Sequence, residues 1–215
     1  MNHQFTTLLI GALALVGGLR AADQPAANTN LPPCCAKELA ATAPLSGRSL
    51  YQLESSWTND AGATRRLADL RGRPQVVTMF FATCQLTCPV LLNDLKRLEA
   101  ALPAALRTNV GFVLVSFDTE RDTPEVLAGY RKIHELAERW TLLRGGPDDV
   151  LEFANLLGVK FKKDVRGQFA HSNVITILDA GGEIVRQIPG LNRDMAEAVR
   201  ALETTVTPVP DITPK

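Results

Sequence analysis

The chain has 215 residues, enough for one domain with a buried core and some additional segments. Its 46% hydrophobic and 21% charged residues are typical of a soluble globular protein. Basic and acidic residues each count 23, and the sequence contains no Walker or dinucleotide-binding glycine motif, so the composition argues against nucleic acid as a partner.

The first 22 residues predict a targeting segment. Residues 5–19 are almost all apolar or small, no Lys, Arg, Asp or Glu precedes Arg20, and the small pair Ala21-Ala22 follows. This pattern is typical of a secretory signal peptide, and a retained amino-terminal membrane anchor is the alternative. We therefore expect the globular part outside the cytoplasm, in the periplasm, either soluble after cleavage or anchored to the inner membrane.

Residues 23–47 are rich in Ala, Pro, Asn and Thr, which predicts a linker. Cys34 and Cys35 lie in this segment without a neighbouring histidine. We interpret them as an incidental or surrogate redox pair, with an auxiliary metal-loading site as the alternative. Residues 48–204 are expected to form the globular domain, and residues 205–215 a flexible tail.

Strands and helices alternate along the predicted domain. The expected strands are 51–58, a short segment ending at 67, 76–81, 110–117, 140–143, 174–178 and 183–188, and the expected helices are 88–101, 124–139, 148–157 and 194–202. This order predicts an α/β fold, a thioredoxin-like three-layer sandwich with a central mixed sheet and an amino-terminal β-hairpin.

Two cysteines, Cys84 and Cys88, follow the apolar strand at 76–81 and directly precede an amphipathic helix. They are expected at the carboxyl edge of the sheet, where open α/β sheets bind ligands. A helix amino terminus favours the thiolate, which binds soft metals and attacks disulfides. The pair therefore predicts a metal-thiolate site, a redox dithiol or both. A structural disulfide is the weaker alternative, since it would close a very small loop, and two inert buried thiols fit poorly with the polar neighbours.

His171 lies in a predicted loop that leads into the strand at 174–178. We expect this loop at the same sheet edge as the thiols, although a surface or core histidine is the alternative. Two thiolates and one imidazole suit Cu(I), and can accept Cu(II) with an added ligand. Zinc competes, but a structural zinc site takes four ligands and the sequence shows no fourth. His134, on the helix expected over 124–139, is interpreted as solvated surface.

The acidic loop before the helix at 124 has two interpretations. Asp122 or Thr123 is expected to cap that helix, with Pro124 at its first position. The alternative is an auxiliary acidic contact close to the thiols.

Three motifs in order carry a resemblance to a known family. They are Thr83-Cys84-x-x-x-Cys88-Pro89, Ser116-Phe117-Asp118-x-x-Arg121-Asp122-Thr123-Pro124, and His171-Ser172 before a strand ending in Leu178-Asp179-x-x-Gly182. Over roughly residues 47–202 the chain resembles the SCO/SenC copper chaperones, which support assembly of the copper centre of cytochrome c oxidase. The resemblance implies a thioredoxin fold and Cys84, Cys88 and His171 as copper ligands.

The sequence departs from the family pattern at Gln85, Thr119 and Ala170, where the family usually has Pro, Pro and Asp. None of these changes removes an implied ligand. Without an acidic neighbour, however, the imidazole of His171 is expected to be less basic or less firmly oriented.

These features predict a copper-binding metallochaperone that delivers copper to an apo-cytochrome c oxidase subunit or another copper carrier. Because binding needs reduced thiols, oxidation to a disulfide would switch it off. The alternative is a thiol–disulfide reductase that uses Cys84 and Cys88 to keep copper-site cysteines of the oxidase reduced. Reductants of this fold usually carry a cis-proline before the strand that begins near Asn173, and the absence of proline there favours metal binding. A peroxidase is a weaker third candidate, because Thr83-Cys84 lacks the Pro-x-x-x-Thr-x-x-Cys pattern.

Overall fold

A computed structural model describes residues 44–206 of the chain. The predicted targeting segment, most of the predicted linker with Cys34 and Cys35, and almost all of the predicted tail lie outside these residues. None of the helices between residues 44 and 206 has the length and apolar character needed to cross a bilayer.

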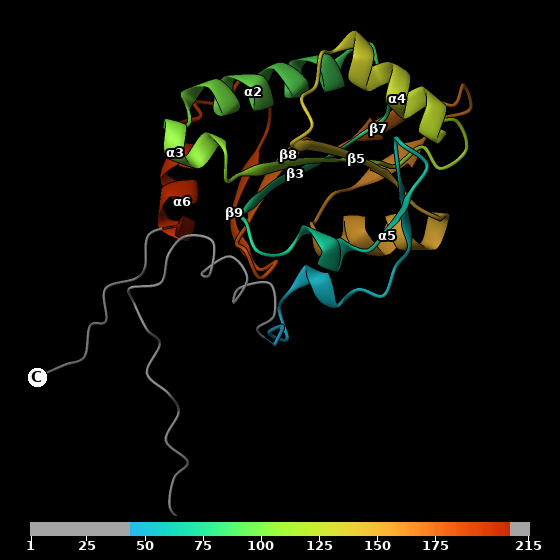
Figure 1. Ribbon diagram of the computed structural model, residues 1–215. Helices are drawn as coiled ribbons and strands as arrows, with labels where there is room; N and C mark the ends of the chain where they lie inside the picture. The colour runs from blue at the N-terminus through green and yellow to red at the C-terminus, as the bar shows by residue number, and fades with distance from the viewer. Residues whose placement is uncertain (1–43, 207–215) are drawn as a thin grey trace, which may run out of the picture. The chain divides into compact units, whose positions relative to one another are not determined.

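The described residues form a three-layer α/β sandwich (Figure 1). In chain order its elements are η1 Leu50–Gln52, β1 Trp57–Asn59, β2 Thr64–Arg65, η2 Leu67–Leu70, β3 Gln75–Phe80, α2 Thr87–Ala101, α3 Ala104–Arg107, β4 Gly111–Ser116, α4 Pro124–Ile133, β5 Trp140–Arg144, α5 Pro147–Leu156, β6 Phe161–Lys163, β7 Phe169–His171, β8 Val174–Leu178, β9 Ile184–Pro189 and α6 Ala196–Val206.

Seven strands form one mixed sheet in the order β2-β1-β5-β4-β3-β8-β9. Strands β3, β4 and β5 are parallel, and the other pairs are antiparallel. Figure 1 shows α2 and α4 on one face of the sheet and α5 on the other. The predicted thioredoxin-like architecture, with its mixed sheet and amino-terminal β1–β2 hairpin, is confirmed.

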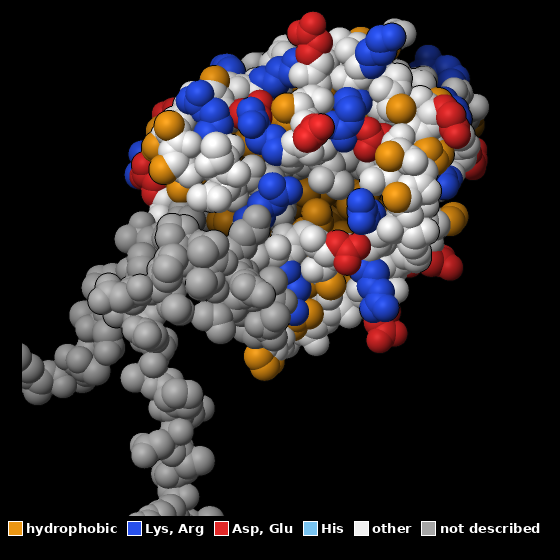
Figure 2. All heavy atoms as spheres, in the orientation of Figure 1, with side chains coloured by type: hydrophobic (Ala, Val, Ile, Leu, Met, Phe, Trp, Pro, Cys, Tyr) orange, Lys and Arg blue, Asp and Glu red, His pale blue; other side chains and the backbone are white. Residues whose placement is uncertain are grey.

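Burial explains why strands β3 and β4 do not alternate between apolar and polar residues. All six residues of β3 and all six of β4 are buried, so both strands are mostly apolar instead of alternating, and their polar side chains Gln75, Thr78 and Ser116 are buried too. Helix α2 packs Leu91, Leu95 and Leu98 against the sheet at helical spacing. On the outer face drawn in Figure 2, positive and negative side chains are interspersed.

The strand expected over residues 51–58 is wrong for most of its length. Ser49 instead begins the short helix η1, since its hydroxyl accepts the Tyr51 N–H at 3.1 Å and donates to the Gly181 carbonyl. The ring of Tyr51 packs on Gly182, where a Cβ would lie 2.5 Å from it. These contacts with the β8–β9 turn, distant in sequence, leave only Trp57–Asn59 to pair as β1.

The helix expected over residues 124–139 ends at Ile133, earlier than predicted. Glu135 has a left-handed backbone with φ 52°, which stops the helix. The guanidinium of Arg131 donates to the carbonyls of Leu136, Ala137 and Trp140 and pairs with Asp60, so the following loop is held without helical hydrogen bonds.

His134 is partly buried at the end of α4, so its interpretation as solvated surface is wrong. Its ring lies 4.2 Å from that of Tyr130, measured between centroids. Burial, followed by the charge of Lys96, lowers the pKa of His134. The strand predicted over residues 174–178 is found with these ends as β8, and the remaining predicted strands and helices are present with shifted ends.

Candidate metal centre

The two thiols lie between the end of β3 and the first turn of α2. Cys84 is half-buried in the connecting turn, while Cys88 is buried in the first turn of the helix with 3% of its surface exposed. The Cys88 backbone N–H donates to the Cys84 sulfur at 3.3 Å. The amino terminus of α2 thus places a hydrogen-bond donor and the positive end of its dipole on Cys84.

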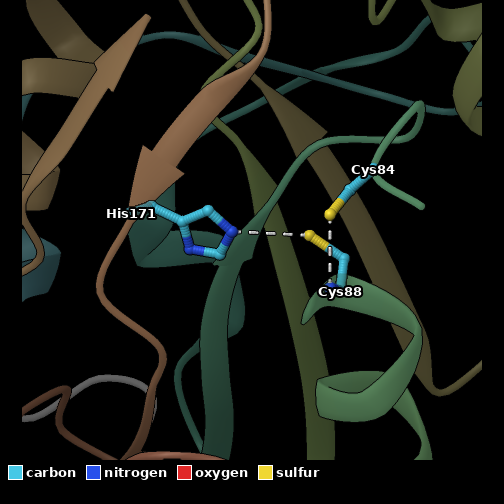
Figure 3. A group of neighbouring side chains, drawn as sticks. All are labelled: Cys84, Cys88 and His171. Atoms are coloured by element: carbon cyan, nitrogen blue, oxygen red, sulfur yellow. Dashed lines mark hydrogen bonds between the residues drawn. The ribbon is translucent and has the colours of Figure 1, made fainter. Parts of the chain in front are cut away.

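His171 is the last residue of strand β7, so its prediction as a loop residue is wrong. Strands β6 and β7 form a separate two-stranded sheet in which His171 is opposite Phe161. Its Nδ1 lies 3.1 Å from the Ser172 carbonyl oxygen, which fixes Nδ1 as the protonated nitrogen. The lone pair of Nε2 then faces the Cys88 sulfur at 3.7 Å (Figure 3).

The structure brings all three predicted ligand residues together. The two Sγ atoms and one imidazole nitrogen lie within 4.8 Å of one another, with the thiols on one side and the imidazole on the other (Figure 3). Donor atoms at this spacing can converge on one ion. The backbone carbonyl of Ser172 orients the ring, as an acidic neighbour would have done.

Thr87 was missed as a site residue by the sequence reasoning. Its hydroxyl lies 3.1 Å from Nε2 of His171 and 3.7 Å from the Cys84 sulfur. The only signal in the sequence is a hydroxyl residue directly before Cys88 at the start of a helix.

The two cysteines differ in acidity. Burial raises the pKa of Cys84, but hydrogen bonds from the Cys88 backbone and side chain, the Leu86 backbone and the Thr87 hydroxyl outweigh it, so the pKa is lowered overall. Burial, with a further contribution from Cys84, raises the pKa of Cys88 well above its usual range. Burial also lowers the pKa of His171, so its imidazole is neutral and able to bind a metal at neutral pH.

This asymmetry predicts the order of alkylation in the reduced, metal-free protein. Iodoacetamide at neutral pH should modify Cys84 at least about tenfold faster than Cys88, because the thiolate is the nucleophile and each pKa unit changes its population about tenfold. Timed quenching and mass spectrometry of the peptides that contain each cysteine measure the two rates. Equal rates would contradict the assigned environments.

A cavity of about 560 Å³ opens onto Cys84 and His171. Its other lining residues include Leu86, Arg166 and Phe169, whereas Cys88 does not line it. Cys84 and His171 are therefore accessible to another molecule from the cavity, whereas Cys88 does not face it.

A cluster of aromatic rings lies beneath His171. The Phe117 ring is 4.9 Å from the imidazole, measured between centroids, and lies between 5.1 and 5.5 Å from those of Phe81, Phe161 and Phe169. These rings keep water from the inner side of the imidazole and account for the burial that lowers its pKa.

The acidic loop before α4 fulfils both of its predicted roles. Thr123 caps the helix by accepting the Val126 N–H, and Pro124 takes the first helical position. Asp122 is not the cap. It is buried, and its Oδ2 accepts the Ala82 N–H at 2.9 Å, two residues before Cys84.

Comparisons with known proteins agree with this geometry. The family model described as SCO1/SenC matches residues 45–207. A protein of Stutzerimonas stutzeri named for copper binding is 27% identical over 141 residues, which cover 64% of this chain and 67% of the relative.

Solved structures show the same fold. A SCO1/SenC family lipoprotein from Bacillus anthracis matches with a TM-score of 0.66 and 24% identity, over 76% of this chain and all (100%) of its own. Yeast Sco1 with copper bound matches with a TM-score of 0.61 and 22% identity, over 73% of this chain and 89% of its own. Because the family model spans the whole sandwich and all three motifs, this chain belongs to the SCO1/SenC family.

Proposed function

We propose that the chain binds one copper ion through Cys84, Cys88 and His171 and acts as a copper metallochaperone. The observation that carries this proposal is the placement of two sulfurs and one imidazole nitrogen within 4.8 Å of one another. Thiolate and imidazole donors select Cu(I), and a further ligand would admit Cu(II). The copper bound to yeast Sco1 and the name of the Stutzerimonas stutzeri relative support copper over zinc.

The site residues have distinct roles in binding and release. Cys84, half-exposed and with its pKa lowered, offers the first thiolate to copper arriving through the cavity. Cys88 must lose its proton as the ion binds, and His171 is already neutral with Nε2 free of a proton. Because Cys84 and His171 face the cavity, an acceptor's thiolate can reach the ion from that side and displace the donors one at a time.

The proposed acceptor is an apo-cytochrome c oxidase subunit or another copper carrier. The protein BsSco, of similar fold, is a member of the Sco family of cytochrome c oxidase assembly proteins. We place the transfer in the periplasm, with residues 1–22 as a cleaved signal or membrane anchor and residues 23–47 as a linker to the copper-binding domain.

Anaerobic titration of the reduced protein with Cu(I) against a chromophoric chelator tests the site. Wild type should bind one ion per chain, and His171→Ala should weaken the affinity by about 100-fold, because losing a ligand should cost at least as much as losing an outer partner. The matched control is His134→Ala, since this second partly buried histidine lies at the end of α4 among Tyr130 and Lys96. Unchanged affinity in His171→Ala would remove the imidazole from the site.

A thiol–disulfide reductase is the second candidate, favoured by the half-exposed Cys84 with its lowered pKa. The Cys84 thiolate would attack a target disulfide, break its S–S bond with release of one target thiolate, and form a mixed disulfide with the other target sulfur. Cys88 would then displace the target thiolate and leave a Cys84–Cys88 disulfide. This exchange needs the two sulfurs but not the imidazole, so His171→Ala should retain it. Unchanged copper affinity in that variant together with retained reductase activity would favour the reductase.

A further inference from the structure

The thiols and the imidazole are carried by separate parts of the fold. Cys84 and Cys88 follow β3 of the seven-stranded sheet, whereas His171 ends the β6–β7 hairpin, which has no strand pairing with that sheet. The spacing between sulfur and nitrogen therefore depends on contacts that join two segments to a common support: this hairpin, and the turn between β3 and α2 that carries Cys84, here called the thiol turn.

Arg121 joins the hairpin to the end of β4. Its Nε pairs with the Asp118 carboxylate, and its Nη2 donates to the Gly167 carbonyl in the turn between β6 and β7. Asp118 is fully buried, so the guanidinium is anchored firmly. Gly167 has φ +74°, and a Cβ on it would lie 3.3 Å from Nη1 of Arg121, so the turn fits closely against the guanidinium.

Asp122, the next residue, holds the thiol turn. Its Oδ2 accepts the Ala82 N–H at 2.9 Å and the Ser116 hydroxyl at 2.5 Å. The Asp122 side chain is fully buried, and Ala82 stands between the end of β3 and Cys84. The start of the turn that carries Cys84 is thereby fixed to the end of β4.

We propose that Arg121 and Asp122 form a clamp that sets the distance between the thiols and His171. Two adjacent residues of one loop contact the two halves of the site, one through Gly167 and the other through Ala82. Both are positioning residues, because these side-chain hydrogen bonds end on the backbone of Gly167 and Ala82 and on the side chains of Asp118 and Ser116, and not on a donor atom of the site. This inference deepens the proposed function. Its test by copper affinity rests on that function, whereas its test by hydrogen exchange in the metal-free protein does not.

The first test compares Arg121→Met with Arg186→Met. Arg186 lies on β9, outside the cavity at the site, and its side chain pairs with the partly exposed Glu197 of α6. We expect Arg121→Met to weaken Cu(I) binding about tenfold, in the range for outer partners of metal ligands, and Arg186→Met to stay within about twofold. Arg121→Lys keeps the charge but has a single nitrogen, so it should give an intermediate affinity.

A spectroscopic signature separates positioning from general destabilisation. In Arg121→Met the Cu(II) form should show weakened nitrogen hyperfine coupling, because His171 is displaced. Asp122→Ala should retain that coupling and shift the sulfur-to-copper charge-transfer band, because it frees the thiol turn. Asp122→Asn keeps an acceptor oxygen for Ala82 and should resemble wild type. Circular dichroism and thermal unfolding establish that each variant is folded.

Hydrogen exchange in the metal-free protein tests the clamp without copper. Amides of β6 and β7 should exchange about tenfold faster in Arg121→Met than in wild type, the effect of losing a hydrogen bond to a charged group, with no change in Arg186→Met. Faster exchange in Arg121→Met, together with a wild type that binds no copper, would refute the proposed function and leave the clamp standing. Unchanged exchange and unchanged copper affinity in a folded Arg121→Met would overturn the clamp.

Discussion

Serine in place of Cys88 should abolish Cu(I) binding at the proposed site. The substitution replaces a soft thiolate with a hard hydroxyl while preserving shape, and leaves one thiolate and one imidazole. Since removing an outer partner of a ligand already costs about 10- to 100-fold in metal affinity, we expect a loss larger than about 100-fold. Competition with a Cu(I) chelator under anaerobic conditions measures it.

The control replaces the two cysteines of the predicted linker. Cys34→Ser with Cys35→Ser removes two thiols where Cys88→Ser removes one, but these two lie outside the described residues. We expect this double variant to bind one copper ion per chain with the affinity of wild type. Full binding by Cys88→Ser would disprove the assigned ligand set, and half the copper in the double variant would reveal a second site in the linker.

The sequence predicted the parts of the fold that local pattern determines. The largely apolar runs of β3 and β4 and the leucines of α2 have the patterns typical of the elements they form, so burial and pattern agree. The thiols were placed correctly because a strand end and a helix start fix them. Their roles as copper ligands stay predictions.

The elements that were missed are held by contacts between distant residues. Strands β6 and β7 have three residues each, none of them fully buried, so both are too short to establish a strand pattern in the sequence. They are fixed by the packing of Phe161 and Phe169 on Phe117 and by the bond from Arg121 to Gly167. The early end of α4 likewise depends on Arg131 and its ion pair with Asp60. Contacts of this kind, between residues distant in the sequence, cannot be predicted from its periodicity.

Thr87 and Arg121 escaped the sequence reasoning for a related reason. The Thr87 hydroxyl gains its role from an imidazole 84 positions away, and Arg121 from a carbonyl 46 positions away. The resemblance placed Arg121 in a motif without giving it a partner. Such roles become visible only when the fold brings the partners together.

Phe117→Ala should have the largest effect on stability among changes near the site. Phe117 is 2% exposed, and its ring contacts those of Phe81, Phe161, Phe169 and His171. Truncating a buried phenylalanine leaves a cavity and costs about 3–5 kcal/mol of unfolding free energy. Urea unfolding monitored by circular dichroism measures this loss.

Phe112→Ala separates the loss of stability from the loss of the site. Phe112 is fully buried near the other end of β4, stacked on Trp140 at 4.6 Å between centroids, so its truncation should cost a similar free energy. Of these two phenylalanines, Phe117 is the one that contacts the β6–β7 hairpin and the ring of His171. Phe117→Ala should therefore also weaken copper binding, by about tenfold, and Phe112→Ala should not. Equal copper affinities in the two folded variants would mean that the aromatic cluster stabilises the domain without positioning the imidazole.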